Sequence, residues 1–187
     1  MLSDPLFWQA LGNTVIYTAI VTPLIFLPAF GLALLLDRPI AGAVLFRSTY
    51  FLPVTLSFVV ASLMWKWIYN DTFGILNYLL RALGVVREPI IWLGTTWSAR
   101  WAVSLMVAWK TTGLSMMILL AGLQAIPREL YEAAAIDGAG ASQAFRWVTA
   151  PLIRPVFALA LIISVAGSFK AFDHFFIMTR GGPSNTT

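Results

Sequence analysis

Ionisable side chains are rare in the long apolar segments of this sequence, and together with some of the hydroxyl side chains in these segments they are the first candidates for function. Lys110 interrupts one apolar run, Thr111 and Ser115 follow it closely, and Ser164 lies in a later run. An ionisable group in such a run is costly unless it faces protein or water, so it marks a functional position by default. We take these four residues as candidates to line a solute pathway.

A second interpretation of the same residues stays open. In this interpretation, Lys110 binds a backbone carbonyl or an acidic neighbour within a helix bundle. Serine and threonine in apolar helices commonly make packing hydrogen bonds. The sequence alone therefore nominates these positions without deciding between contact with a solute and contact with neighbouring helices.

Catalysis is poorly supported by the reactive side chains. The chain has no cysteine and a single histidine, His174. Asp173 precedes it directly, and adjacent side chains on a helix diverge by about 100°, so these two cannot form an acid/base dyad with each other. We expect no catalytic residue and no metal site, and an intramembrane enzyme is a poor alternative.

Nucleotide binding is also not predicted. No Gly-x-x-x-x-Gly-Lys-Ser/Thr pattern occurs, and Gly181-Gly182 is followed by proline rather than by a lysine that would reach phosphates. We expect that this chain binds no cofactor, and that any ATP is used by a partner subunit.

Composition indicates a membrane protein. Of 187 residues, 59% are hydrophobic and 11% are charged, and the mean hydropathy is +0.83. Such a chain is far more apolar than an average globular domain. The net charge of +4 does not indicate nucleic-acid binding, because the basic residues are scattered between apolar runs rather than gathered in one stripe.

Four segments are apolar enough to cross a bilayer: residues 14–36, 48–67, 101–124 and 155–176. The first carries no charge, and as a helix it would be about 34 Å long, which is enough to cross the hydrocarbon layer. These segments predict an all-α membrane protein, a polytopic transmembrane helical bundle, in one domain over residues 1–187.

Two features lie at the ends of these spans. Trp65, Trp67 and Tyr69 lie at the far end of the second span, either as an interfacial aromatic belt or as helix-packing residues. Between residues 71 and 100, leucine and isoleucine recur at helical spacing from Ile75 to Leu83. This spacing predicts a short amphipathic helix on the membrane surface.

The segment between the third and fourth spans, residues 126–154, has dense internal order without being apolar. Pro127 suits the first turn of a helix, and Glu129 and Glu132 favour its positive end. Gly138 and Gly140 supply a turn. A first helix followed by a turn is therefore predicted.

A second short helix is predicted after the turn. Ser142 is a suitable N-cap, residues 143–149 would form the helix, and Pro151 would end it. The helix-turn-helix has almost no side-chain bulk at Ala133 and Ala134, which lets another backbone come close. We interpret it as a docking loop.

This stretch resembles the EAA loop of bacterial ABC-importer permeases. The motif is Glu-Ala-Ala, then glycine after three intervening residues, then an apolar residue and proline. The matching residues are Glu132, Ala133, Ala134, Gly138, Val148 and Pro151. The flanking residues, and a Thr-x-Gly-Gly-Pro turn at residues 179–183, resemble the carbohydrate-importer branch. In that family the loop inserts into a groove on a cytoplasmic ATPase.

The resemblance implies the type I importer permease fold, with about six spans of which four are present, so we expect a piece of a longer permease. It implies that residues 126–154 face the cytoplasm and that residues 71–100 lie outside. The coupling residues it implies are Glu129, Glu132, Ala133, Ala134, Asp137, Gly138 and Pro151.

The resemblance further implies a function and a set of partners. The chain would form half of the pathway for a sugar or related carbohydrate in a bacterial inner membrane. Its partners would be cytoplasmic ATPase subunits, a second homologous permease, a periplasmic or lipid-anchored solute-binding protein, and membrane lipid, but not nucleic acid. A secondary transporter or a membrane scaffold without an ATPase is the alternative, and it would leave the docking loop unexplained.

Overall fold

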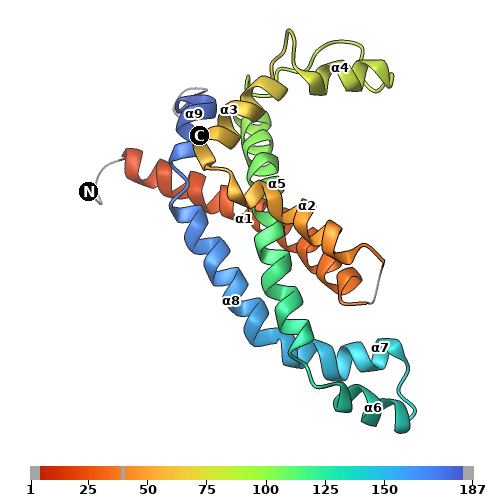
Figure 1. Ribbon diagram of the computed structural model, residues 1–187. Helices are drawn as coiled ribbons and strands as arrows, with labels where there is room; N and C mark the ends of the chain where they lie inside the picture. Colours follow the sequence, from red (N-terminus) through yellow and green to blue (C-terminus); the bar gives the residue numbers. More distant parts are fainter. Residues whose placement is uncertain (1–4, 39–40, 183–187) are drawn as a thin grey trace.

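The computed structural model describes residues 5–38 and 41–182, and within these ranges every regular element is a helix (Figure 1). The α-helices are α1 (Pro5–Leu36), α2 (Ala43–Thr55), α3 (Phe58–Ile68), α4 (Ile75–Ala82), α5 (Thr96–Gln124), α6 (Arg128–Ile136), α7 (Ala141–Ala144), α8 (Ala150–Phe169) and α9 (Asp173–Thr179). A π-helical stretch, Phe145–Thr149, joins α7 to α8. Pro183, the last residue of the Thr-x-Gly-Gly-Pro turn, lies outside the described residues.

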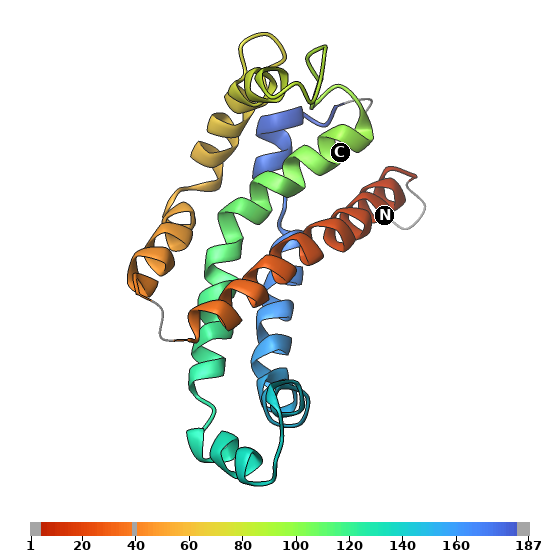
Figure 2. The same cartoon turned by 90° about the vertical axis from the view of Figure 1, so that its right-hand side faces the viewer.

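Helix α5 is the centre of the bundle. It contributes the largest share of the buried residues, and Figure 2 shows α1 crossing it while α8 runs alongside. Two glycines allow close packing against it. A Cβ on Gly113 would collide with the Tyr50 carbonyl of α2, and a Cβ on Gly122 would lie 2.8 Å from the side chain of Val156 on α8.

The spans differ from the predicted segments mainly in their boundaries and continuity. Helix α1 begins at Pro5 rather than at residue 14. Helix α5 begins at Thr96, where Thr95 accepts from the Ser98 N–H at 3.2 Å and forms a capping box with it. Three helices of the described chain, residues 5–36, 96–124 and 141–169, are long and apolar enough to cross a membrane, or four if α2 and α3 count as one broken span.

The second segment, residues 48–67, is not one continuous helix. It breaks between α2 and α3, whose axes differ by 99°. Leu56 is extended, and the Ser57 side chain accepts from the Val60 N–H at 3.2 Å, which starts a new helix. Pro53, within the last turn of α2, lacks the N–H that would continue the ladder, which weakens the helix just before the break.

The fourth segment differs at both ends. The short helix predicted over residues 143–149 was expected to end at Pro151. This is wrong, because the helix continues through Pro151 to Phe169. Its first turn, α7, begins after Gly140 rather than after the predicted N-cap Ser142. The Ala150 N–H bonds to the Phe145 carbonyl, one residue further back than in an α-helix. This wider π turn directly precedes Pro151. The regular α-helical hydrogen-bond pattern is therefore already interrupted where the proline follows. At the other end, residues 170–172 form a turn before α9, so the helix ends before residue 176.

Candidate functional site

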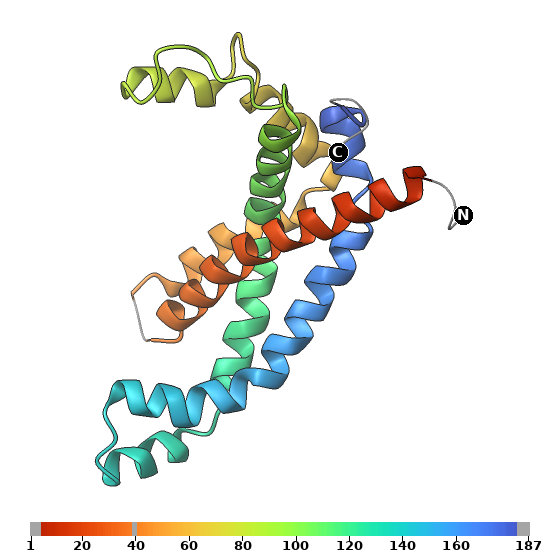
Figure 3. The ribbon, with the colours of Figure 1, turned by 180° about the vertical axis from the view of Figure 1, so that it is seen from behind.

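The hairpin formed by α6 and α7 projects from one end of the bundle, opposite the end that carries α4 (Figure 3). None of the residues of α6 or α7 is buried. One hydrogen bond ties α6 to the π-helical stretch that leads into α8, since the Tyr131 hydroxyl lies 2.9 Å from the Thr149 hydroxyl. The hairpin is therefore a tethered but solvent-accessible element.

The turn of the hairpin requires glycine at position 138. Gly138 has a φ of 78°, in the left-handed region. Its N–H bonds to the Ala135 carbonyl at 3.1 Å, and the Ala139 N–H bonds to the Ala134 carbonyl at 2.9 Å. This pair of bonds is a Schellman motif, which satisfies the last carbonyls of α6 and fixes the direction in which the chain leaves it.

Most of the coupling residues implied by the resemblance lie on this hairpin. Glu129, Glu132, Ala133, Asp137 and Gly138 are exposed, and Ala134 is half-buried. At about 100° per residue, Glu129, Glu132 and Ala133 share the face of α6 opposite Tyr131. Pro151 lies apart from them, half-buried in α8.

Two strongly exposed large apolar side chains on or beside the hairpin were not predicted as site residues. Ile136 lies on the exposed face of α6 and is 87% exposed, and Trp147, in the π-helical stretch after α7, is 72% exposed. The available signal was a large apolar side chain at the exposed end of a short helix that begins with Arg128 and Glu129. With Glu129, Glu132 and Ala133, Ile136 forms what we call the α6 docking face.

Lys110 makes the contact that the sequence analysis left as its alternative. The residue is 4% exposed. Its ammonium donates to the Val54 carbonyl at 3.2 Å and lies 3.5 Å from the Pro53 carbonyl. It also lies 4.6 Å from the centre of the Phe58 ring, a cation–π contact. Lys110 thus binds the end of α2 and the beginning of α3.

The hydroxyl candidates differ in how they are used. Thr111 donates to the Val107 carbonyl at 2.7 Å, which is a packing bond within α5. Ser115 is buried on the same helix. The Ser164 hydroxyl on α8 is buried and has no hydrogen-bond partner among the described residues. The Ser164 hydroxyl therefore has unused hydrogen-bonding capacity.

A buried polar contact links the first and last described helices. The Tyr17 hydroxyl of α1 lies 3.2 Å from Nε2 of His174 on α9. The His174 ring stacks on Phe58 of α3, with centroids 5.2 Å apart. The Lys110 ammonium also lies over the Phe58 ring. Helices α1, α3, α5 and α9 are therefore joined by one chain of contacts. The sequence separation of 157 residues between Tyr17 and His174 hid this from the sequence analysis.

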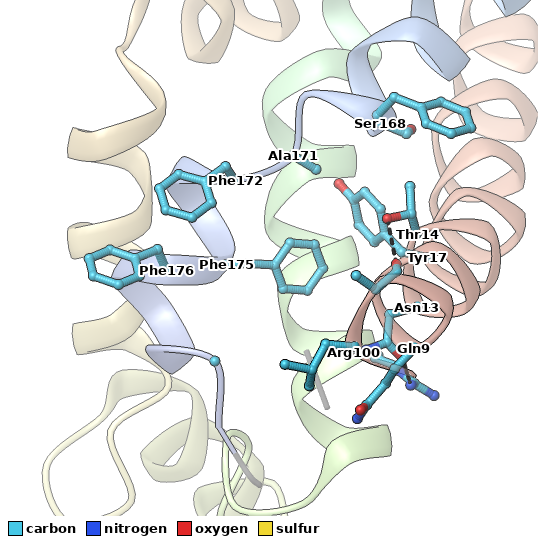
Figure 4. A pocket seen from close by; sticks show the side chains of 14 residues that line it. Gln9, Asn13, Thr14, Tyr17, Arg100, Ser168, Ala171, Phe172, Phe175 and Phe176 are labelled. Carbon is cyan, nitrogen blue, oxygen red and sulfur yellow. Dashed lines mark hydrogen bonds between the residues drawn. The ribbon is translucent and has the colours of Figure 1, made fainter. Parts of the chain in front are cut away.

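A cavity of about 480 Å³ opens between α1, the start of α5 and the α8–α9 turn (Figure 4). Arg100 is 8% exposed and donates to the Asn13 side chain at 2.6 Å at one end. At the other end Phe175 points toward Tyr17, and their rings meet edge to face at 4.8 Å. The cavity has aromatic and hydrogen-bonding walls drawn from distant parts of the sequence.

Comparison with known proteins gives a match over nearly the whole chain. The family model described as "Binding-protein-dependent transport system inner membrane component" matches residues 5–185. A trehalose/maltose transport system permease protein, MalF, of Thermococcus litoralis is 36% identical over 187 residues, which cover 100% of this chain and 63% of that protein. A sulfoquinovosyl glycerol transport system permease protein, SmoG, of Agrobacterium fabrum is 38% identical and covers 100% and 60%.

A solved structure shares the fold. A chain of a bacterial ABC transporter involved in the import of the acidic polysaccharide alginate superposes with a TM-score of 0.83 at 22% identity, covering 99% of this chain and 64% of that one. The likeness confirms the predicted all-α permease architecture. This chain spans less than two thirds of the length of these relatives.

Proposed function

Because the chain belongs to the family of inner-membrane components of binding-protein-dependent transport systems, we propose that it forms half of the translocation pathway of an ATP-binding-cassette importer. As a multi-pass helical membrane protein it would pair with a second, homologous permease in a bacterial inner membrane. A solute-binding protein would deliver the solute at the end that carries α4, and ATPase subunits would bind at the opposite end.

The observation that carries this proposal is the exposed α6–α7 hairpin at one end of the bundle. A connection between two spans needs only a short loop, whereas this one builds a helix whose residues are all at least partly exposed. The α6 docking face combines carboxylates, a small residue and an exposed isoleucine. A pocket on another protein would accept Ile136 and would pair with Glu129 and Glu132.

Each coupling residue has a role in this proposal. Glu132 makes a polar contact with the ATPase, and Glu129 and Asp137 add negative charge beside it. Ala133 and Ala134 permit close approach of the partner's backbone. Gly138 sets the turn, and Pro151 follows the π-helical stretch through which motion of the hairpin would reach α8.

We further propose that the solute is a sugar or related carbohydrate. The support comes from the names of three relatives. The first two are named for transport of trehalose/maltose and of sulfoquinovosyl glycerol. A third, a protein of Rhizobium radiobacter that is 38% identical, is named for transport of lactose. Ser164 and Ser115 are the candidates to line the pathway, since their hydroxyls are suited to hydrogen bonds with sugar hydroxyls. Lys110 and Thr111 would support the pathway by holding helix geometry.

In this proposal the chain binds no nucleotide, and hydrolysis belongs to the partner. ATP binding would draw two ATPase subunits together, move the hairpins with them, and tilt the spans so that the pathway opens to the other side. Rigid helices such as α5 and α8 suit this role because they transmit displacement over the thickness of the membrane.

Uptake by proteoliposomes tests the proposal. The full-length permease is reconstituted with its partner permease, its ATPase and its solute-binding protein, and uptake of labelled maltose, trehalose and lactose is measured. The proposal predicts uptake of a sugar that requires ATP and the binding protein. Uptake driven by an ion gradient without ATP would support the secondary-transporter alternative instead.

A further inference from the structure

Helix α4 belongs to an arm that reaches sideways from the bundle. The chain leaves α3 at Ile68, forms α4 and returns to α5 at Thr96. Figures 1 and 3 show α4 lying crosswise to α5, beyond the outer ends of the spans. The arm is not needed to connect α3 with α5, because these helices already end near each other.

The arm is held in shape by one buried side chain. Asn77 is 3% exposed. Its amide donates to the Ile90 carbonyl at 3.0 Å, and its oxygen accepts from the Ile90 N–H and from the Trp92 indole, each at 3.1 Å. The returning segment is thereby fixed against the Asn77 side of α4, and both views place this segment on the side of α4 that faces away from the spans.

The opposite side of α4 is apolar and uncovered. At about 100° per residue, Ile75 and Leu79 lie opposite Asn77, and Leu83 continues their row. These side chains are 57%, 48% and 76% exposed, respectively. Arg81 lies away from this row and is exposed. Because Asn77 faces outward, the apolar row faces the side on which the spans enter the bilayer.

We propose that α4 lies in the outer lipid interface, with Ile75, Leu79 and Leu83 at the boundary between headgroups and acyl chains. The row continues a belt of exposed tryptophans at the same ends of α3 and α5, where Trp67, Trp97 and Trp101 are 73%, 59% and 48% exposed. Tryptophan at span ends marks the headgroup level.

The amphipathic pattern favours the same occupant, because a helix with one apolar row and polar residues on another face has the pattern of helices that lie in a membrane surface. The exposed charges of the arm balance one another, since Arg81 and Arg87 are accompanied by Asp71 and Glu88, and they add no preference of their own. A solute-binding protein would approach from the outside, where the returning segment covers α4. The inference rests on the membrane assignment of the family and not on transport.

Nitroxide labelling tests this placement directly, because the chain has no cysteine. Single-cysteine variants Leu79→Cys and Leu83→Cys are labelled, with Arg81→Cys as the matched control on another face of the same helix. Each variant is the full-length chain, checked for a monodisperse elution profile, in vesicles of phosphatidylcholine and phosphatidylglycerol. Collision of each label with oxygen and with a water-soluble nickel chelate is measured by power-saturation EPR.

The proposal predicts that the ratio of oxygen to nickel collisions is several-fold higher at Leu79 and Leu83 than at Arg81. A ratio that is equally low at all three positions would overturn it, because the arm would then stand in water. Protection of Leu79 and Leu83 from both reagents would also overturn it, in favour of a protein partner. None of these outcomes depends on ATP or on sugar uptake, so the arm and the importer function are tested separately.

Discussion

The Lys110 ammonium lies 3.2 Å from the carbonyl oxygen of Val54, at the point where α2 ends and α3 begins. The last carbonyls of a helix lack partners within the helix and carry its negative end. A buried cation from α5 therefore stabilises the break in the second span, and it also packs over Phe58 on the other side of that break.

Lys110→Met is expected to destabilise the bundle by about 2 kcal/mol, because a hydrogen bond to a charged group is lost and the Val54 carbonyl is left unpaired, whereas the Pro53 carbonyl still accepts from the Leu56 N–H. Lys110→Arg is expected to recover part of this loss. Thr111→Val is the matched control, since the Thr111 hydroxyl bonds only within α5. Unfolding of the purified protein in a denaturing detergent measures the difference. Equal stability of Lys110→Met and Thr111→Val would contradict this role.

The Tyr17–His174 contact is expected to contribute about 1 kcal/mol, as a single buried hydrogen bond does. A double-mutant cycle with Tyr17→Phe and His174→Phe isolates it, because the cycle removes effects that each substitution has alone. The same unfolding assay applies. A coupling free energy indistinguishable from zero would show that α1 and α9 are not joined by this bond.

Gly113→Ala is expected to destabilise the bundle by about 1–3 kcal/mol, because the added Cβ would collide with the Tyr50 carbonyl of α2. Gly31→Ala is the control, since a Cβ there meets no atom within 4 Å. Thermal unfolding in detergent separates the two. If both substitutions have the same effect, the close approach of α2 to α5 at this point is wrong.

Gly138→Val is expected to strain the turn after α6 by about 1–2 kcal/mol, because the residue must adopt a positive φ. Sugar uptake per ATP hydrolysed should fall while membrane insertion is unchanged. Gly138→Asn, which tolerates this conformation, should retain more activity. Gly140→Ala is the control because its φ is −74°. Full coupling in Gly138→Val would count against the role of the turn.

The sequence allowed the local features to be predicted and missed those that depend on distant contacts. The apolar segments, the docking hairpin and the turn at Gly138 followed from runs of apolar residues and from glycine and proline, which act within a few residues. The all-α architecture followed from the apolar segments and the permease fold from the resemblance of residues 126–154 to the EAA loop, and the likeness to a solved structure confirms both.

The break between α2 and α3 could not be predicted in the same way, because residues 48–65 are free of charge and read as one helix. Its partner, Lys110, lies 56 residues away from Val54. The stop expected at Pro151 failed for a local reason, since a π-helical stretch directly before it lets the helix continue. The cavity beside Arg100 draws on four helices, and no sequence period joins them.

The most direct test of the central claim is co-purification of the detergent-solubilised full-length protein with its partners from the native membrane. Wild type is compared with Glu132→Lys on the α6 docking face, and with Glu88→Lys, an exposed carboxylate on the outer arm. The account predicts that an ATPase subunit elutes with wild type and Glu88→Lys and is lost from Glu132→Lys, while a second permease is retained by all three. Elution of no ATPase with wild type, or equal recovery with Glu132→Lys, would contradict it.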